Sequence, residues 1–276
     1  MNYFDTGIKL LEKIEELGYK AYIVGGSVRD LLLNYPIHDI DITTNMPLDE
    51  INKHFDVIDN GSVYLSVTIN YLGYKFETTN FRRDLEYNDH RHPKIVLASS
   101  LEEDSNRRDF TINALAIDKN NNIIDYHNGK KDLDGKIIRA IGDPAKRFEE
   151  DALRILRAIY FSSKLNFKIE DKTLKAMVNK KELLAHLSKE RILEYIIKII
   201  NSKYKKGIDY INKYDLLSSI NEYKELLKII DKNYDPKDYV YYYYIKYDNF
   251  LSYTSKAEKK KASIIKSLMI LIKCRR

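Results

Sequence analysis

The segment Ala21–Asn45, which reads AYIVGGSVRDLLLNYPIHDIDITTN, constrains the fold of this 276-residue chain more than any other segment. The apolar run Lys20–Val24 predicts a strand that breaks at Gly25-Gly26, and Ser27–Leu33 then has helical apolar spacing. A second β-branched run, Asp39–Thr43, predicts another strand. The segment therefore predicts two strands with a helix between them.

Two carboxylates in the second of these runs suggest metal chemistry. Asp39 and Asp41 are separated by one residue, and alternate side chains of a strand share a face, with Cα atoms about 6.6 Å apart after two steps of ~3.3 Å. That spacing lets both reach a pair of divalent cations about 4 Å apart, and hard oxygen ligands suit Mg²⁺. The pair Gly25-Gly26 lets backbone N–H groups approach a phosphate closely. The combination predicts nucleotidyl transfer.

Each feature alone has a simpler explanation. A glycine pair is usually just a turn, and an Asp-x-Asp pattern is often a solvated loop edge. The sequence contains neither the G-x-G-x-x-G dinucleotide fingerprint nor the G-x-x-x-x-G-K-[ST] phosphate loop. Those two classes of nucleotide-binding protein are therefore excluded.

Composition and charge indicate a non-membrane protein with an uneven charge distribution. No apolar run approaches the ~18 residues of a membrane span, and the single cysteine, Cys274, excludes an internal disulfide framework. We therefore expect a cytoplasmic protein. Residues 191–276 carry 19 Lys and Arg against 10 Asp and Glu. This basic part is typical of a surface for a nucleic-acid backbone, although a solvated Lys-rich face explains it equally well.

The pattern changes from mixed to helical near residue 144. Further elements are predicted before that point, namely strands at Val57–Asp59, Tyr64–Asn70 and Tyr74–Thr79 and helices at Asp5–Leu17, Pro47–His54 and Phe110–Leu115. After Pro144 only helices are predicted, at Ala145–Lys164, Asp171–Asn179 and Ser188–Asn201 and onwards. The charged segment Phe81–Pro93 is predicted to be a flexible surface loop in which His90 and His92 are solvated.

Four motifs together resemble one family. They are Gly25-Gly26-Ser27-Val28-Arg29-Asp30 followed by Asp39-Ile40-Asp41, then Arg107-Arg108-Asp109-Phe110-Thr111-Ile112-Asn113-Ala114, then Glu150-Asp151-Ala152-Leu153-Arg154-Ile155-Leu156-Arg157, and finally Glu190-Arg191-Ile192. Their order resembles that of the class II CCA-adding tRNA nucleotidyltransferase and bacterial poly(A) polymerase family. The resemblance implies an α+β fold, with a polymerase-beta-type nucleotidyltransferase head at residues 1–144. An all-α neck at 145–205 and a short basic helical body at 206–276 would follow.

Glu77 is the predicted third catalytic carboxylate beside Asp39 and Asp41. On the strand Tyr74–Thr79 it faces opposite to Phe76, so it can lie beside the Asp-x-Asp strand if the two strands pair. The resemblance places the family's third acid at this position. A solvated strand glutamate is the alternative.

Two arginines and an aspartate are predicted to contact the nucleotide. Arg29 lies in the first helical turn after the glycines and can fold back towards phosphates. The resemblance implies that Arg108 and Asp109 recognise ribose and phosphates. A surface ion pair is the alternative for Arg108, and Asn113 fits a structural role as well as a functional one.

The segment Glu149–Ser163 is predicted to be one helix on which Asp151, Arg154 and Arg157 form a row at three-residue spacing. A carboxylate can accept from the amine of cytosine or adenine while a guanidinium donates to the adjacent ring acceptor. Uracil and guanine present the opposite order, so they would leave buried groups unpaired. An ordinary salt-bridge ladder is the alternative. Tyr160 stands where the family often has a third arginine.

The predicted function is template-independent addition of C and A to the tRNA 3′ end from CTP and ATP, with Mg²⁺ as cofactor and pyrophosphate as product. In the family a loop like Phe81–Pro93 is associated with the change from C to A addition. The alternatives are an A-specific enzyme, either an A-adding tRNA enzyme or a poly(A) polymerase, and a silent RNA-binding module. The family usually continues through a longer body and tail, so we expect a truncated chain or a compact member. The sequence leaves the oligomeric state open.

Overall fold

The computed structural model describes residues 2–61, 65–87 and 93–221, together with residues 223, 224, 227, 259, 260, 263 and 264. The chain divides into two compact units. The head unit comprises Met1–Asp151 and Lys168–Leu174, and the helical unit comprises Ala152–Phe167 and Lys175–Arg276. The predictions for His90, His92 and Cys274, and for most of the basic C-terminal part, lie outside the described residues.

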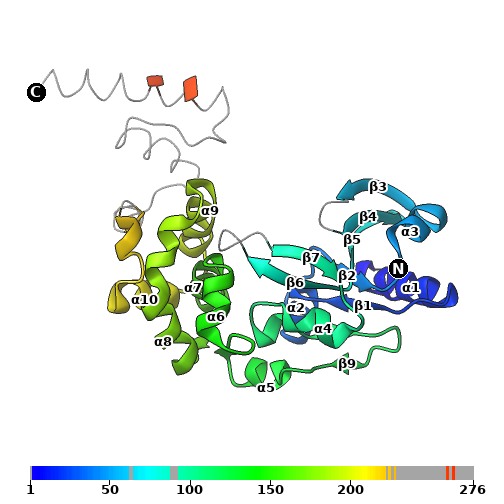
Figure 1. Ribbon diagram of the computed structural model, residues 1–276, viewed down its shortest axis with the longest axis horizontal. Helices are drawn as coiled ribbons and strands as arrows, with labels where there is room; N and C mark the ends of the chain where they lie inside the picture. The colour runs from blue at the N-terminus through cyan, green and yellow to red at the C-terminus, as the bar shows by residue number, and fades with distance from the viewer. Residues whose placement is uncertain are drawn as a thin grey trace, which may run out of the picture. The chain divides into compact units, whose positions relative to one another are not determined.

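A seven-stranded sheet in the order β3-β4-β5-β2-β1-β8-β9 organises the head unit (Figure 1). Its strands are β1 (Ala21–Val24), β2 (Asp41–Thr44), β3 (Asp56–Gly61), β4 (Ser66–Tyr71), β5 (Tyr74–Asn80), β8 (Ala116–Ile117) and β9 (Ile123–Ile124). Neighbouring strands pair antiparallel except β2 and β5, which are parallel. The predicted mixed sheet is confirmed.

A two-residue turn sets the register of β5. Leu72 and Gly73 both have positive φ, 50° and 84°, which matches the twist of a two-residue antiparallel hairpin. The turn pairs Tyr71 with Tyr74. Because strand side chains alternate, this register fixes which residues of β5 share a face.

Helix α1 (Tyr3–Glu16) packs against β1 and β5. Its Leu10, Leu11 and Ile14 are fully buried. A Cβ on Gly7 would lie 3.2 Å from Ile23 and 3.3 Å from Phe76, so this glycine lets the helix approach the sheet closely. The other head helices are short: α2 (Gly26–Leu32), α3 (Leu48–His54), α4 (Leu101–Asn106), α5 (Gly129–Asp134) and α6 (Pro144–Glu150).

The predicted loop Phe81–Pro93 is wrong in its first half. Residues Arg82–Tyr87 form strand β6, which pairs antiparallel with β7 (Pro93–Leu97); residues 88–92 are outside the described ranges. Leu85 of β6 and Leu97 of β7 are both exposed. A ribbon that buries no continuous face needs no alternating apolar pattern, so periodicity could not reveal it.

The predicted helix Phe110–Leu115 is also wrong, because only Thr111–Asn113 forms a 3₁₀ turn. Phe110 makes a β-bridge with Ala140, and the Thr111 N–H donates to the Arg139 carbonyl. These long-range bonds replace the local ones of an α-helix. Directly before Arg139, strand β10 (Ile137–Ile138) pairs parallel with β11 (Lys168–Ile169).

The helical unit contains α7 (Leu153–Leu165), most of α8 (Asp171–Lys180), α9 (Lys189–Ile200) and α10 (Lys206–Tyr214), with 3₁₀ turns at Lys181–His186 and Ser218–Ile220. The predicted helices at 171–179 and 188–201 are confirmed by α8 and α9. Helix α7 packs against both α9 and α10 (Figure 1). In the part of the chain that the structure describes, no helix combines the length and the apolar character of a membrane span.

A single helix through Glu149–Ser163 is not observed. Helix α6 ends at Glu150, and Asp151 has extended backbone angles of φ −144° and ψ 101°. Helix α7 then begins at Leu153. An aspartate side chain can hydrogen-bond to nearby backbone groups in non-helical conformations. This favours a break of the helix at Asp151. Asp151 therefore does not share a helical row with Arg154 and Arg157.

Candidate active site

Two carboxylates are aligned on adjacent strands of the head sheet. Asp41, the first residue of β2, is the direct neighbour of Glu77 on β5. Parallel pairing brings them together, because adjacent strands lie only about 4.8 Å apart. Asp39 lies just before β2. Ile40 and Ile42 are buried, whereas Asp39 and Asp41 are exposed. The alternation therefore places both aspartates on the solvent side.

Partial loss of hydration, together with repulsion from neighbouring carboxylates, raises the pKa of Asp41 to about 6. The largest cause is partial loss of hydration, since many protein atoms surround the carboxylate although its surface reaches solvent. Repulsion from Glu77, and less strongly from Asp39, adds to the rise, while Arg108 opposes it. Among the described residues, no group of three or more His, Cys, Asp or Glu side chains is arranged to hold a metal ion.

The glycine turn lies against Asp41 and Arg108. Gly25 has φ 78° and ψ −137°, a conformation that glycine adopts without strain. A Cβ built on it would lie 3.3 Å from Nη1 of Arg108 and 3.5 Å from Oδ2 of Asp41. The missing side chain therefore leaves backbone, cation and carboxylate facing the same small space.

Arg29 folds back over the same turn. Its Nη2 atom is 3.5 Å from the Cβ position of Gly26, while Nη1 donates to Oδ1 of Asn113 at 2.6 Å. The side chain also pairs with Asp30 at 2.7 Å and is almost fully buried. Arg29 is thus held in one orientation by partners on both sides of its guanidinium.

Asp109 is directed into the protein. Its Oδ1 accepts from the Phe110 N–H at 2.8 Å and from Nδ2 of Asn113 at 3.1 Å. Asn113, buried like Asp109, therefore links Asp109 to Arg29. The structure connects these three residues through hydrogen bonds at one side of the glycine turn.

Sequence reasoning missed Asp104, a fully buried carboxylate on α4. Its Oδ1 accepts from Arg107, and its Oδ2 accepts from Nη2 of Arg108 at 3.2 Å. The signal was present, because an acid three and four residues before two arginines lies on the same helical face. The run Leu101–Asn106 contains three acids, and nothing in the sequence distinguishes the buried one.

The helical unit holds the two arginines of the predicted row. Arg154, in the first turn of α7, is 6% exposed. Arg157 donates to the Tyr195 hydroxyl at 2.9 Å and lies over the Phe161 ring at 5.3 Å. Tyr160, where the family often has arginine, makes an edge contact with the Tyr195 ring. Aromatic side chains of α7 and α9 thus support Arg157.

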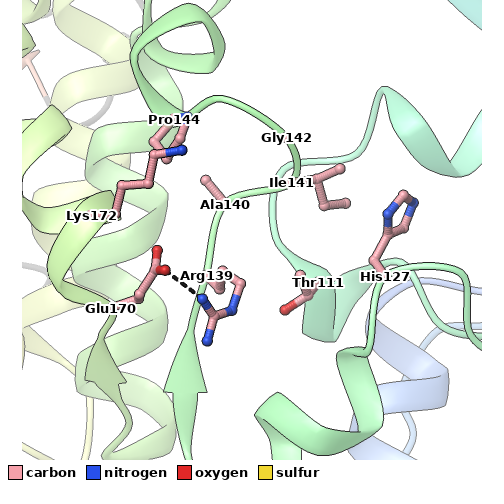
Figure 2. Close-up of a pocket in the computed structure, with 9 residues that line it drawn as sticks. All are labelled: Thr111, His127, Arg139, Ala140, Ile141, Gly142, Pro144, Glu170 and Lys172. Atoms are coloured by element: carbon pink, nitrogen blue, oxygen red, sulfur yellow. Dashed lines mark hydrogen bonds and ion pairs between the residues drawn. The ribbon is translucent and has the colours of Figure 1, made fainter.

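A separate hollow of about 240 Å³ lies elsewhere in the head unit, and none of its lining residues belongs to the predicted site. Figure 2 shows Glu170 and Arg139 paired at its wall, with Lys172 and His127 on opposite sides. Arg139 also donates to Asp132 at 2.9 Å. Its charge is therefore balanced by two carboxylates of the head unit itself.

Sequence comparisons identify the head and the part that follows it. Residues 21–139 match the family described as the poly(A) polymerase head domain, and residues 166–227 match a probable RNA- and SrmB-binding site of polymerase A. A CCA-adding enzyme of Staphylococcus haemolyticus is 47% identical over 77% of this chain and 54% of its own length. One of Lactobacillus delbrueckii subsp. bulgaricus is 46% identical over 72% and 51%. The chain spans about half the length of these curated relatives.

Solved structures with a similar fold are enzymes of the same kind. A Bacillus stearothermophilus CCA-adding enzyme in complex with CTP has a TM-score of 0.73 and 36% identity, over 78% of this chain and 53% of that one. A tRNA nucleotidyltransferase complexed with a primer tRNA and an ATP analog has a TM-score of 0.64 and 28% identity, over 86% and 67%. The head is accordingly of the polymerase-beta nucleotidyltransferase type, followed by helices. This chain belongs to the family of class II CCA-adding tRNA nucleotidyltransferases and bacterial poly(A) polymerases.

Proposed function

We propose that the chain catalyses template-independent addition of C and A to the 3′ end of tRNA, using CTP and ATP and releasing pyrophosphate. The observation that carries this proposal is the alignment of Asp41 with Glu77 beside a glycine turn that Arg108 also faces. Carboxylates for metal and a cationic, glycine-lined space for phosphates are the two requirements of nucleotidyl transfer. Relatives named CCA-adding enzyme support tRNA as the acceptor.

The donor set fits Mg²⁺, with Asp39 and Asp41 as its ligands. Mg²⁺ sites in nucleotide enzymes usually take one or two carboxylates and complete their shell with substrate phosphates and water. That agrees with a site in which the described residues form no three-acid cage. A cation would also relieve the repulsion that raises the pKa of Asp41. When bound, the metal would activate the RNA 3′-hydroxyl and neutralise the triphosphate.

The other head residues bind and orient the nucleotide. The Gly25 and Gly26 backbone allows close approach of phosphate oxygens, and Arg108 supplies a positive charge at that point. Arg29 forms the second side of the turn. Asp109 holds Arg29 in place through Asn113. The family resemblance implies that Asp109 also contacts the ribose.

Base selection is assigned to Asp151, Arg154 and Arg157 on the family resemblance, since Asp151 does not continue the row on α7. Arg154 is buried in the first turn of α7, and a guanidinium that donates to an acceptor on a base discriminates against a base edge that presents a donor there. In this proposal residues 1–144 carry the chemistry and 145–205 select the base. Residues 206–276 contribute positive charge for the tRNA backbone, and the reaction takes place in the cytoplasm.

The test uses two tRNA substrates, one ending at the discriminator base and one ending in CC, each incubated with a single labelled nucleotide. We expect CTP alone to extend the first and ATP alone to extend the second, with no extension by UTP or GTP. Extension of the CC substrate without any C addition would identify an A-specific enzyme instead. If neither substrate is extended, the result would favour an RNA-binding module without activity.

Three variants serve as controls for that assay. Asp39→Ala and Asp41→Ala should each abolish incorporation, because mutating groups that merely orient metal ligands already costs about 10–100-fold. Glu77→Ala should cost less than either but still reduce the rate strongly. Near-normal turnover by the aspartate variants would contradict the metal assignment.

A further inference from the structure

Asp104 is the most deeply buried carboxylate near the glycine turn. Its side chain is 0% exposed, and the side chains of Arg107 and Arg108 that it contacts are each 16% exposed. Nε and Nη2 of Arg107 reach Oδ1 at 3.0 and 2.9 Å, while Nη2 of Arg108 reaches Oδ2 at 3.2 Å. Each oxygen of Asp104 thus receives a different arginine.

The carboxylate is ionised at neutral pH. Burial alone would raise the pKa of Asp104, but the charges of Arg107 and Arg108 outweigh it and hold the pKa below its usual value. A buried charge of this kind is retained only when its hydrogen bonds are satisfied. Asp104, Arg107 and Arg108 therefore form a buried ionic cluster whose side chains are held in place.

The cluster leaves one nitrogen of Arg108 directed at the glycine turn. With Nη2 held by Asp104, Nη1 lies 3.3 Å from the Cβ position of Gly25. The planar guanidinium can satisfy both positions at once because its donors point in fixed directions. Asp41 is the other carboxylate that attracts Arg108. Both carboxylates attract Arg108, and its hydrogen bond is made to Asp104.

Asp104 is also tied to the end of the catalytic strands. Its Oδ1 accepts from the backbone N–H of Arg82 at 3.1 Å. The preceding residue, Phe81, donates its N–H to the Thr44 carbonyl at the end of β2. Through Asp104, hydrogen bonds therefore connect Arg108 to the strands that carry Asp41 and Glu77.

We propose that Asp104 is a positioning residue for the incoming nucleoside triphosphate: it holds Arg108 over the glycine turn, where the cation receives the phosphates, and keeps it from pairing with Asp41. This inference rests on the proposed function. The Asp104 side chain is 0% exposed, so it acts on the nucleotide through the residues that it holds, and Arg108 is the one beside the glycine turn. The relation between the two residues is the part that an experiment can isolate.

A double-mutant cycle on nucleotide affinity provides the test. The Kd for ATP and for CTP is measured by calorimetry in the presence of Mg²⁺, without RNA, for the wild-type protein, Asp104→Asn, Arg108→Ala and the double variant. An amide holds the Arg108 guanidinium less strongly than a carboxylate does, so we expect Asp104→Asn to weaken binding by about tenfold. In the Arg108→Ala background the same change should have no further effect. An equal loss in both backgrounds would overturn the proposal.

Arg108→Lys is the second variant, in case Asp104→Asn does not fold. An ammonium group held by Asp104 cannot also reach the space beside Gly25, so Arg108→Lys should bind nucleotide as weakly as Arg108→Ala. Full affinity in Arg108→Lys would overturn the proposal. Asp132→Asn is the matched control, since Asp132 is 4% exposed and pairs with Arg139 outside the site. It should lower the melting temperature and leave both Kd values unchanged.

The same measurements separate this inference from the proposed function. Wild-type protein that binds nucleotide but does not extend tRNA would contradict the proposed function. The double-mutant cycle on nucleotide affinity would still test the role of Asp104. Wild-type protein that extends tRNA while Asp104→Asn binds nucleotide normally would overturn the inference alone. A wild-type protein that binds neither nucleotide would overturn both.

Discussion

Asp41 is subject to two opposing requirements. As a proposed metal ligand Asp41 must be ionised, yet hydration is partly lost around this carboxylate and Glu77 is its direct neighbour. The folded protein therefore raises the pKa of Asp41 from 3.8 to about 6. The proposed function requires the charged form of Asp41, whereas the metal-free fold is more stable with the neutral form.

This conflict predicts a pH-dependent gain in stability for Asp41→Asn. Between about pH 4 and 6 the folded state binds more protons at Asp41 than the unfolded state does, so the contribution of Asp41 to stability falls as pH rises through that window. Above pH 6 the ionised side chain is destabilising, and asparagine removes that cost. We expect the variant to melt above wild type at about pH 8, with the difference vanishing towards about pH 4.

Thermal unfolding of both proteins across this pH range, in EDTA, measures the difference while other titrating groups cancel. A variant that is no more stable than wild type at pH 8 would show that Asp41 is not crowded by its neighbours. The variant should be inactive throughout, so stability and activity should change in opposite directions.

Arg154→Ala should lose discrimination between nucleotides as well as rate. A guanidinium that reads a base edge contributes about 1–3 kcal/mol of discrimination for each good bidentate pair, by analogy with groove readout. Relative kcat/KM for CTP, ATP, UTP and GTP, with a melting curve, measures both effects. A variant that is less stable but keeps the wild-type preference would identify Arg154 as structural. Lys164→Ala, at the other end of α7, is the control.

At the residue scale, the sequence was informative where spacing and chemistry coincide. Alternation predicts that Glu77 lies beside the Asp-x-Asp strand if the two strands pair, and the structure pairs Glu77 with Asp41. Asp104 could not be recognised, because the burial of one acid among three depends on the packing of α4 beside β6. Local sequence does not contain that information.

At the element scale, regular periodic segments were predicted well and irregular ones were not. Helices α1, α8 and α9 carry clear amphipathic patterns and lie where expected. The turn at Thr111–Asn113 and the β6–β7 ribbon depend on partners far along the chain. The break at Asp151 is a local event that apolar spacing does not reveal, because apolar residues continue on both sides of it.

Helices α7 and α10 approach each other closely at Gly207. A Cβ there would lie 2.3 Å from the Ser163 hydroxyl oxygen and 2.4 Å from the Ile159 carbonyl oxygen. We therefore expect Gly207→Ala to separate the helices and cost about 1–3 kcal/mol, as overpacking does. Chemical denaturation measures the loss. Asn212→Ala, on the exposed side of α10, should be nearly neutral, and a comparable loss in both variants would argue against tight packing at Gly207.

At the scale of the whole molecule, charge is divided along the chain. The net charge is +6, yet residues 191–276 alone carry 19 Lys and Arg against 10 Asp and Glu. The first 190 residues are therefore slightly acidic, and they include the proposed catalytic carboxylates Asp39, Asp41 and Glu77. The division predicts that the basic part contributes most of the attraction for tRNA phosphates.

The salt dependence of tRNA affinity tests this division. A protein with about six phosphate contacts loses about a thousandfold in affinity between about 50 and 200 mM salt. Replacing Lys259, Lys260 and Lys261 by glutamine should weaken binding and reduce the slope of log K against log salt by up to about 2–3. The control replaces Lys9 and Lys13 of α1. If both variants show the same slope, the basic part is only a solvated face.

The order of strands in the head sheet has a consequence for how the protein is made. Strand β1 lies between β2 and β8, and its Val24 pairs with Ala116. Because synthesis proceeds from the N-terminus, β1 must wait for residues nearly a hundred positions downstream before its second edge is covered. Such non-local pairings slow folding. On the ribosome, the strand that leads into the glycine turn therefore keeps an open edge until β8 has emerged, and the active site cannot assemble earlier.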